Sequence, residues 1–95
     1  MRFKVGKGAE GLSVVPRAGK GLEKAPGIRL PEALFAKDEW TEVVMKVDRI
    51  SALAQVGGAD AGYVDIDFAT GPPGIRVAVG GKAKIRDLEI RPLRK

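Results

Sequence analysis

Apolar and polar residues alternate most regularly in two stretches in the second half of the chain, 63–68 (YVDIDF) and 75–79 (IRVAV). Such alternation is typical of β-strands that bury one face. Between the two stretches, Pro73 presets the backbone for a turn and Gly74 tolerates a positive φ. The pattern therefore predicts a central hairpin over residues 62–81, with one apolar face that the rest of the chain must cover.

Shorter alternating stretches predict further strands at residues 2–5, 12–15, 28–30, 41–49 and 82–91. Pro16 should end the second of these, because proline cannot donate to a sheet. In the last stretch the parity of the apolar positions switches, which predicts a β-bulge near Arg86 and Asp87. Residues 50–56 (ISALAQV) fit either a helical turn or a strand.

A short helix is expected near residues 31–39, because Pro31 suits the first helical position. Leu34 and Phe35 should then face the sheet. The fold class is thus mainly β, a small barrel or sandwich of six or seven short antiparallel strands with this one helix. The predicted core consists of Phe3, Val5, Leu30, Leu34, Val43, Met45, Val47, Val64, Ile66, Phe68, Val77, Val79, Ile85, Leu88 and Ile90.

The 95 residues allow a single domain with one core, residues 1–95. Residues 6–11 (GKGAEG) match the spacing of a phosphate-binding loop, but a strand pattern follows where a dinucleotide fold needs a helix. A glycine-rich hairpin turn is therefore the preferred interpretation. Residues 17–27 are expected to form a flexible basic loop, 57–62 another loop, and 92–95 a basic tail.

The composition narrows the possible functions. The chain contains no histidine and no cysteine, so the commonest general base, metal ligand and thiol nucleophile are missing. We expect no enzyme activity, no cofactor and no metal site. No apolar run is long enough to span a membrane and no signal peptide is evident, which favours a cytoplasmic protein or a virion component. The absence of asparagine suits a thermophile, although a GC-rich genome would enrich the same residues.

The charge is unevenly distributed along the chain, although the net value is +5. Residues 1–29 hold seven Lys or Arg against two acids, residues 30–75 three against eight, and residues 76–95 seven against two. Two basic ends therefore flank an acidic middle. If the terminal strands are neighbours, the ends form one basic surface.

Two segments resemble parts of known families. Residues 27–47 (GIRLPEALFAKDEWTEVVMKV) resemble the strand, proline, helix and strand unit of swapped-hairpin transition-state regulators, which are DNA-binding dimers. Residues 81–95 (GKAKIRDLEIRPLRK) are similar to the last strand and tail of single-stranded DNA-binding proteins of filamentous phages. Neither segment identifies the family of the chain.

Two classes of function remain open. The first is a nucleic-acid-binding domain that contacts mainly the phosphate backbone, with single-stranded DNA slightly preferred. The second is a structural or assembly protein, for example a virion component, that self-associates as an oligomer. Trp40 and Tyr63 are candidates for stacking on bases. The candidate nucleic-acid-binding residues are Arg2, Lys4, Lys7, Lys20, Arg76, Lys82, Lys84, Arg86 and Arg91.

Overall fold

The computed structural model describes residues 1–19, 21–67 and 69–90. Within these ranges the chain forms eight strands and one turn of 3₁₀ helix. The elements are β1 (Arg2–Val5), β2 (Glu10–Val15), β3 (Ile28–Arg29), η1 (Glu32–Phe35), β4 (Thr41–Val47), β5 (Ser51–Val56), β6 (Ala59–Asp65), β7 (Gly74–Lys82) and β8 (Ile85–Glu89). The prediction of a mainly β fold is confirmed.

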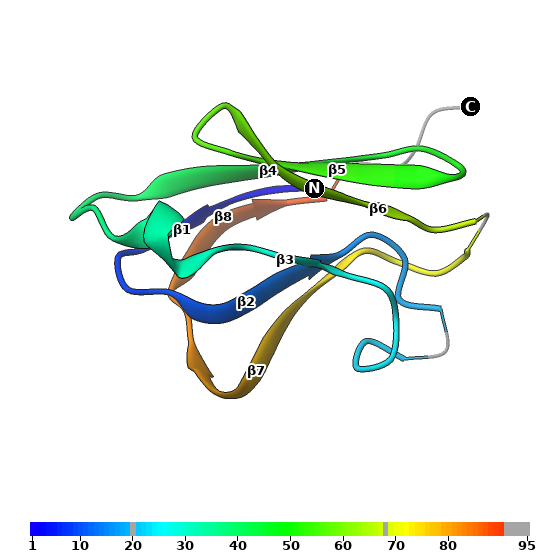
Figure 1. Cartoon of the computed structure of the whole chain (residues 1–95), viewed down its shortest axis with the longest axis horizontal. Coiled ribbons are helices and arrows are strands. Elements are labelled where there is room, and N and C mark those ends of the chain that lie inside the picture. The colour runs from blue at the N-terminus through cyan, green and yellow to red at the C-terminus, as the bar shows by residue number, and fades with distance from the viewer. Residues whose placement is uncertain (20, 68, 91–95) are drawn as a thin grey trace.

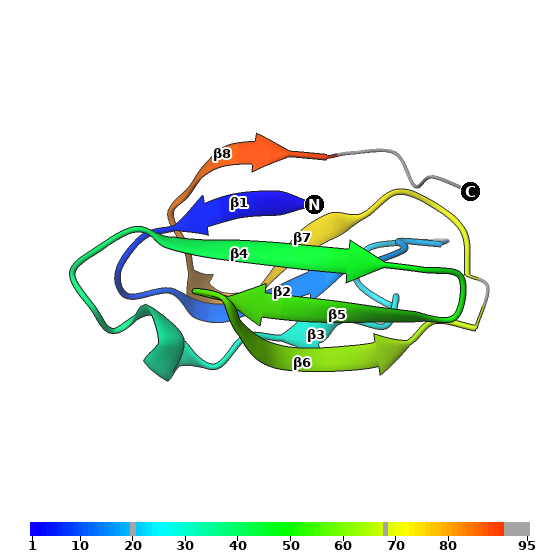
Figure 2. The same cartoon turned by 90° about the horizontal axis from the view of Figure 1, so that it is seen from above.

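The strands form two antiparallel sheets that lie in two layers (Figure 1). One sheet has five strands in the order β6-β5-β4-β1-β8, and the other has three in the order β3-β2-β7. Viewed from above, the five-stranded sheet covers the smaller one (Figure 2). The terminal strands β1 and β8 are neighbours, with Val5 opposite Ile85, so the condition for a joint basic surface is met.

The core lies between the two layers. Phe3 and Val5 of β1 are fully buried, as are Val43 of β4 and Val14 of β2. Along β1 and β4 the buried residues alternate with more exposed neighbours, as the sequence pattern predicts, whereas residues 11–15 of β2 are all buried. Among the predicted core residues, Leu30, Met45 and Ile66 are also buried, and Val47, Val64 and Ile85 pack against the core while half-buried.

The predicted central hairpin is wrong. Residues of β6 pair with β5, whereas β7 pairs with β2 in the other sheet. Gly57 and Gly58 have φ angles of +59° and +86° and connect β5 to β6 as a two-residue turn, so β6 already has its hairpin partner. The loop predicted at 57–62 is therefore mostly strand, and Pro72 and Pro73 lie on a connection between the sheets.

Residues 6–11 do not form the predicted hairpin turn either. Strands β1 and β2 belong to different sheets, and the segment between them crosses from one layer to the other. Its backbone is held by distant partners, because Gly6 N–H donates to the Lys84 carbonyl and Gly8 N–H donates to the Phe35 carbonyl, both at 2.9 Å. The segment thus joins three parts of the chain at one end of the molecule.

The helix predicted at 31–39 is limited to one 3₁₀ turn, Glu32–Phe35. Short helices depend on the apolar surface that they bury, and here only Phe35 is buried, while Leu34 is exposed. Residues 50–56, for which both alternatives were open, form a strand from Ser51.

Four further residues of the predicted core are exposed: Val77, Val79, Leu88 and Ile90. The register of β7 with β2 shifts between Glu10 and Leu12. Residues 78–81 therefore have no partner in the β2 register, and Val79 lies fully exposed. On β8 the predicted bulge is present, since Asp87 has a φ of +56° and the register with β1 shifts there. Leu88 nevertheless stays exposed, as does Ile90 beyond the end of this edge strand. Phe68 lies outside the described residues.

Candidate nucleic-acid interface

At one end of the two layers, β1 ends and the connections β1–β2, η1–β4 and β7–β8 lie together (Figures 1 and 2). The hydrogen bonds of Gly6 and Gly8 described above join these connections. We call this end the Trp40 corner and define it by Lys7, Trp40, Lys82, Lys84 and Arg86. All five side chains are exposed.

Trp40 and Arg86 form the centre of the corner. The guanidinium carbon of Arg86 lies 4.2 Å from the centroid of the indole ring, which is the geometry of a cation–π contact. Trp40 remains 41% exposed. Gly6 lies beside this pair, because a Cβ atom at position 6 would be 3.4 Å from Trp40 Cζ3 and 3.2 Å from Lys84 Cβ. A residue without a side chain therefore lets the indole pack close to β1.

The lysines of the corner form no ion pair within the described residues, although Lys82 lies opposite Glu10 in the register of β7 with β2. Within residues 1–19, 21–67 and 69–90, no carboxylate lies within ion-pair distance of Lys7, Lys82 or Lys84. Arg86 differs, because its Nε is 3.5 Å from Asp87 Oδ2. Solvated ammonium groups without an acidic partner are suited to phosphate oxygens.

Arg2 and Lys4 do not extend this surface as a continuous basic stripe. Arg2 Nε lies 3.9 Å from Glu42 Oε2, and Lys4 Nζ lies 4.0 Å from Asp87 Oδ2. A shallow groove of about 490 Å³ over β1, β4 and β8 is lined by both signs of charge. Partial ion pairing reduces the attraction for phosphate. Arg86 shares Asp87 with Lys4 but also lies over Trp40, so we keep Arg86 in the corner and place Arg2 and Lys4 outside it.

Arg76 supports the structure of the loop rather than joining the corner. Its Nη1 donates to the backbone carbonyls of Leu22, Glu23 and Ala25 at 3.1, 3.2 and 2.9 Å. The guanidinium therefore ties the 17–27 loop to β7. This geometry does not favour Arg76 as a nucleic-acid contact, since the carbonyls occupy the donors of Nη1 and hold the guanidinium against the loop.

The other predicted contacts lie elsewhere. Tyr63 is exposed on β6, at the edge of the five-stranded sheet opposite to β8 (Figure 2). It therefore cannot share a site with Trp40. Lys20, Arg91 and the basic tail 92–95 lie outside the described residues.

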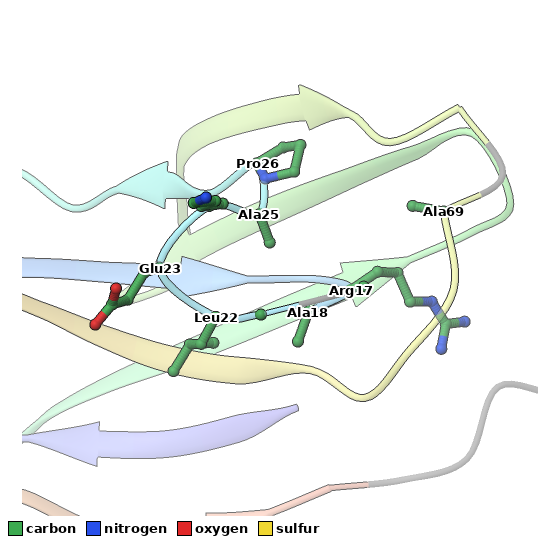
Figure 3. A pocket seen from close by; sticks show the side chains of 10 residues that line it. Arg17, Ala18, Leu22, Glu23, Ala25, Pro26 and Ala69 are labelled. Atoms are coloured by element: carbon green, nitrogen blue, oxygen red, sulfur yellow. The ribbon is translucent and has the colours of Figure 1, made fainter.

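A cavity of about 680 Å³ lies within the 17–27 loop (Figure 3). Mostly small apolar residues and backbone line it, together with Ala69 of the connection between the sheets. Figure 3 shows the side chains of Arg17 and Glu23 extending away from each other, and Arg17 Nη1 donates to the Gly71 carbonyl at 3.2 Å. Because these charged groups do not converge, the cavity offers no evident chemistry.

The sequence was sufficient to name the cations of the corner. It did not reveal the role of Gly6, or the ion pairs that Glu42 and Asp87 form with Arg2 and Lys4. Glu42 and Asp87 lie beside Arg2 and Lys4 only because β1 is between β4 and β8. No local signal reveals that strand order. The close approach of Trp40 to Gly6 likewise depends on two segments that are distant in sequence.

No group of three or more potential metal ligands occurs among the described residues. In the same ranges, no helix has the length and apolar character that crossing a membrane requires. Comparison with protein families, curated proteins and solved structures gives no match to this chain.

Proposed function

We propose that the protein binds nucleic acid by contacting its phosphate backbone at the Trp40 corner. The observation that carries the proposal is that Arg86 lies over the exposed indole of Trp40, while Trp40 and Lys84 both lie beside Gly6. A basic cluster beside an exposed aromatic side chain is the combination that nucleic-acid-binding surfaces use.

Binding of this kind is driven by the release of counterions from the phosphates. Lys7, Lys82 and Lys84, which form no ion pair with the described residues, would neutralise about three phosphates. The logarithm of the association constant should then fall with the logarithm of the salt concentration at a slope of roughly −2 on single strands and about −3 on duplex. Sequence preference should be slight, because the corner contains no Asn or Gln to read base edges.

The experiment compares two double variants that change the net charge equally. Lys82→Glu with Lys84→Glu should abolish binding of a labelled oligonucleotide in ~50 mM salt, because like charges repel phosphate. Lys46→Glu with Arg49→Glu is the matched control, since both residues are exposed near the other end of β4. No binding by the unchanged protein, or an equal loss in both variants, would contradict the proposal.

A second candidate function is self-association, which the exposed apolar residues of β7 and β8 favour. Both strands are edges of their sheets. Antiparallel pairing of β8 with a second copy, in the register that sets Ile85 opposite Ile90, also sets Arg86 opposite Glu89. The strand is thus self-complementary in charge. We place this function second, because the bulge at Asp87 interrupts the regular edge that strand pairing needs.

Sedimentation at micromolar concentration tests the second candidate. A dimer that reverts to monomer in the Ile90→Lys variant would support pairing through β8. A monomer at both low and high salt would rule it out.

A further inference from the structure

The Arg86–Trp40 pair forms a surface on which an aromatic ligand can stack. Arg86 lies over the indole, Gly6 lies beside the ring, and Trp40 as a whole remains 41% exposed. Planar guanidinium and indole groups both stack on nucleobases. The pair therefore offers more than the point charges that phosphate binding requires.

The pair is also restrained before any ligand arrives. Asp87 lies 3.5 Å from the Arg86 guanidinium, and Trp40 contacts the same group. Lys84 lies next to Gly6, since its Cβ is 3.2 Å from the position of a Cβ on that residue. Side chains that are already ordered lose less entropy on binding. A base on the pair would thus have a lysine close by for the adjacent phosphate.

We infer that the Trp40 corner takes single-stranded nucleic acid, with one unpaired base stacked on the Arg86–Trp40 pair. This inference rests on the proposed function and specifies its substrate. Bases inside a duplex are stacked on each other, so they cannot reach an aromatic side chain on the protein surface. Single-stranded DNA and RNA share the required chemistry. Tyr63 does not contribute, because it lies on the opposite edge strand.

The single tryptophan of the chain makes the experiment direct, because fluorescence excited at a wavelength where Tyr63 does not absorb reports on Trp40 alone. Three probes of equal length are titrated in ~50 mM salt: oligo(dT), oligo(U) and an abasic oligonucleotide. Both base-containing strands should quench the fluorescence, whereas the abasic strand should bind without quenching. A similar extent of quenching by dT and U would show that the sugar is not read.

Variants separate stacking from charge. Binding is followed by the anisotropy of a labelled strand, because the Trp40 variants lack the tryptophan. Trp40→Leu should weaken oligo(dT) binding about tenfold, the loss expected for one stacked base, and should leave the abasic strand unaffected. Trp40→Tyr should retain most of the affinity, because the aromatic ring is kept, and it guards against a folding defect in the leucine variant. Tyr63→Leu is the matched control and should change nothing.

The outcomes distinguish the two proposals. Equal binding of the abasic strand and oligo(dT), with no quenching and no loss in Trp40→Leu, would overturn stacking while phosphate binding stands. A duplex of the same length is titrated separately, and tighter binding of this duplex than of oligo(dT) at equal salt would overturn the single-strand assignment. If no probe binds at all, both proposals are wrong.

Discussion

The guanidinium of Arg86 lies over the indole of Trp40, with 4.2 Å between its central carbon and the ring centroid. One residue comes from β8 and the other from the residue just before β4, and the two strands are separated by β1 in the sheet. The contact therefore spans β1 at its carboxyl end, where Gly6 follows the strand. This geometry makes Gly6 a determinant of the corner.

The first prediction concerns Gly6. In Gly6→Ala the new Cβ would lie 3.2 Å from Lys84 Cβ and 3.4 Å from Trp40 Cζ3, both closer than comfortable packing allows. We expect a loss of about 1 to 3 kcal/mol in the free energy of unfolding, as is usual for overpacking, and an altered Trp40 emission spectrum. Urea denaturation followed by circular dichroism measures the first quantity.

Gly21→Ala is the control for Gly6→Ala. A Cβ at position 21 meets no atom within 4 Å, so this exchange should be neutral or slightly stabilising. If both alanine variants unfold at the urea concentration of the unchanged protein, the close packing around Gly6 is refuted.

The second prediction concerns the connection between β7 and the 17–27 loop. Arg76→Ala removes the donor to three backbone carbonyls, so the loop should open more often. Trypsin should then cleave after Arg17 or Lys24 several-fold faster under native conditions. Arg29→Ala removes an exposed arginine with one ion pair, to Glu32, and should leave the cleavage rate unchanged. Equal rates in all three proteins would show that Arg76 does not hold the loop.

The third prediction concerns pH. Backbone N–H groups of Ser51 and Ile50 donate to Asp48 Oδ1 at 2.8 and 2.9 Å, which lowers the pKa of this carboxyl from its ordinary value. Because the pKa of Asp48 is lower in the folded protein than in the unfolded chain, its ionisation stabilises the fold at pH values above the unfolded pKa of about 3.9. This stability is lost as the pH falls through the pKa of the folded protein. Asp48→Asn should therefore be less stable than the unchanged protein at pH 6.

The difference between the two proteins should shrink as the pH falls below about 4. Urea midpoints at several pH values measure it, and the same exchange at Asp38, in the connection between η1 and β4, serves as the control. A constant difference down to pH 2 would mean that the charge of Asp48 contributes nothing to the β4–β5 turn.

Local patterns predicted the strands well, because alternation of side chains is a property of each strand by itself. The apolar residues of β1 and β4 show which face of each strand is buried. Phe3, Val5, Val43 and Met45 all lie in the core. The bulge at Asp87 was also predictable, since the parity of apolar residues changes there. These features depend on residues only a few positions apart.

Strand order was not predictable, because it depends on contacts between distant segments. The Pro-Pro-Gly sequence at 72–74 has the residues of a hairpin turn, yet Gly57 and Gly58 provide the tighter turn and already pair β6 with β5. The same limit applied to the candidate site, because part of it depends on contacts between distant segments. The basic residues could be named from the sequence, whereas the ion pairs of Arg2 and Lys4 and the role of Arg76 required the register.

The last prediction contrasts two residues that alternation alone assigned to the same buried face. Ile66 is 5% exposed, and its N–H donates to the Ile50 carbonyl at 2.7 Å, next to the β5–β6 hairpin. Val79 is fully exposed, because β7 has almost no partner on β2 between Val77 and Lys82. Ile66→Ala should cost about 2 to 5 kcal/mol, the usual loss for a buried isoleucine, whereas Val79→Ala should change the free energy of unfolding by less than about 0.5 kcal/mol. Chemical denaturation of both variants distinguishes the structure described above from the hairpin that the sequence pattern predicted for residues 62–81. A large loss at both positions would mean that the 62–81 segment folds back as a hairpin, with β7 packed into the core.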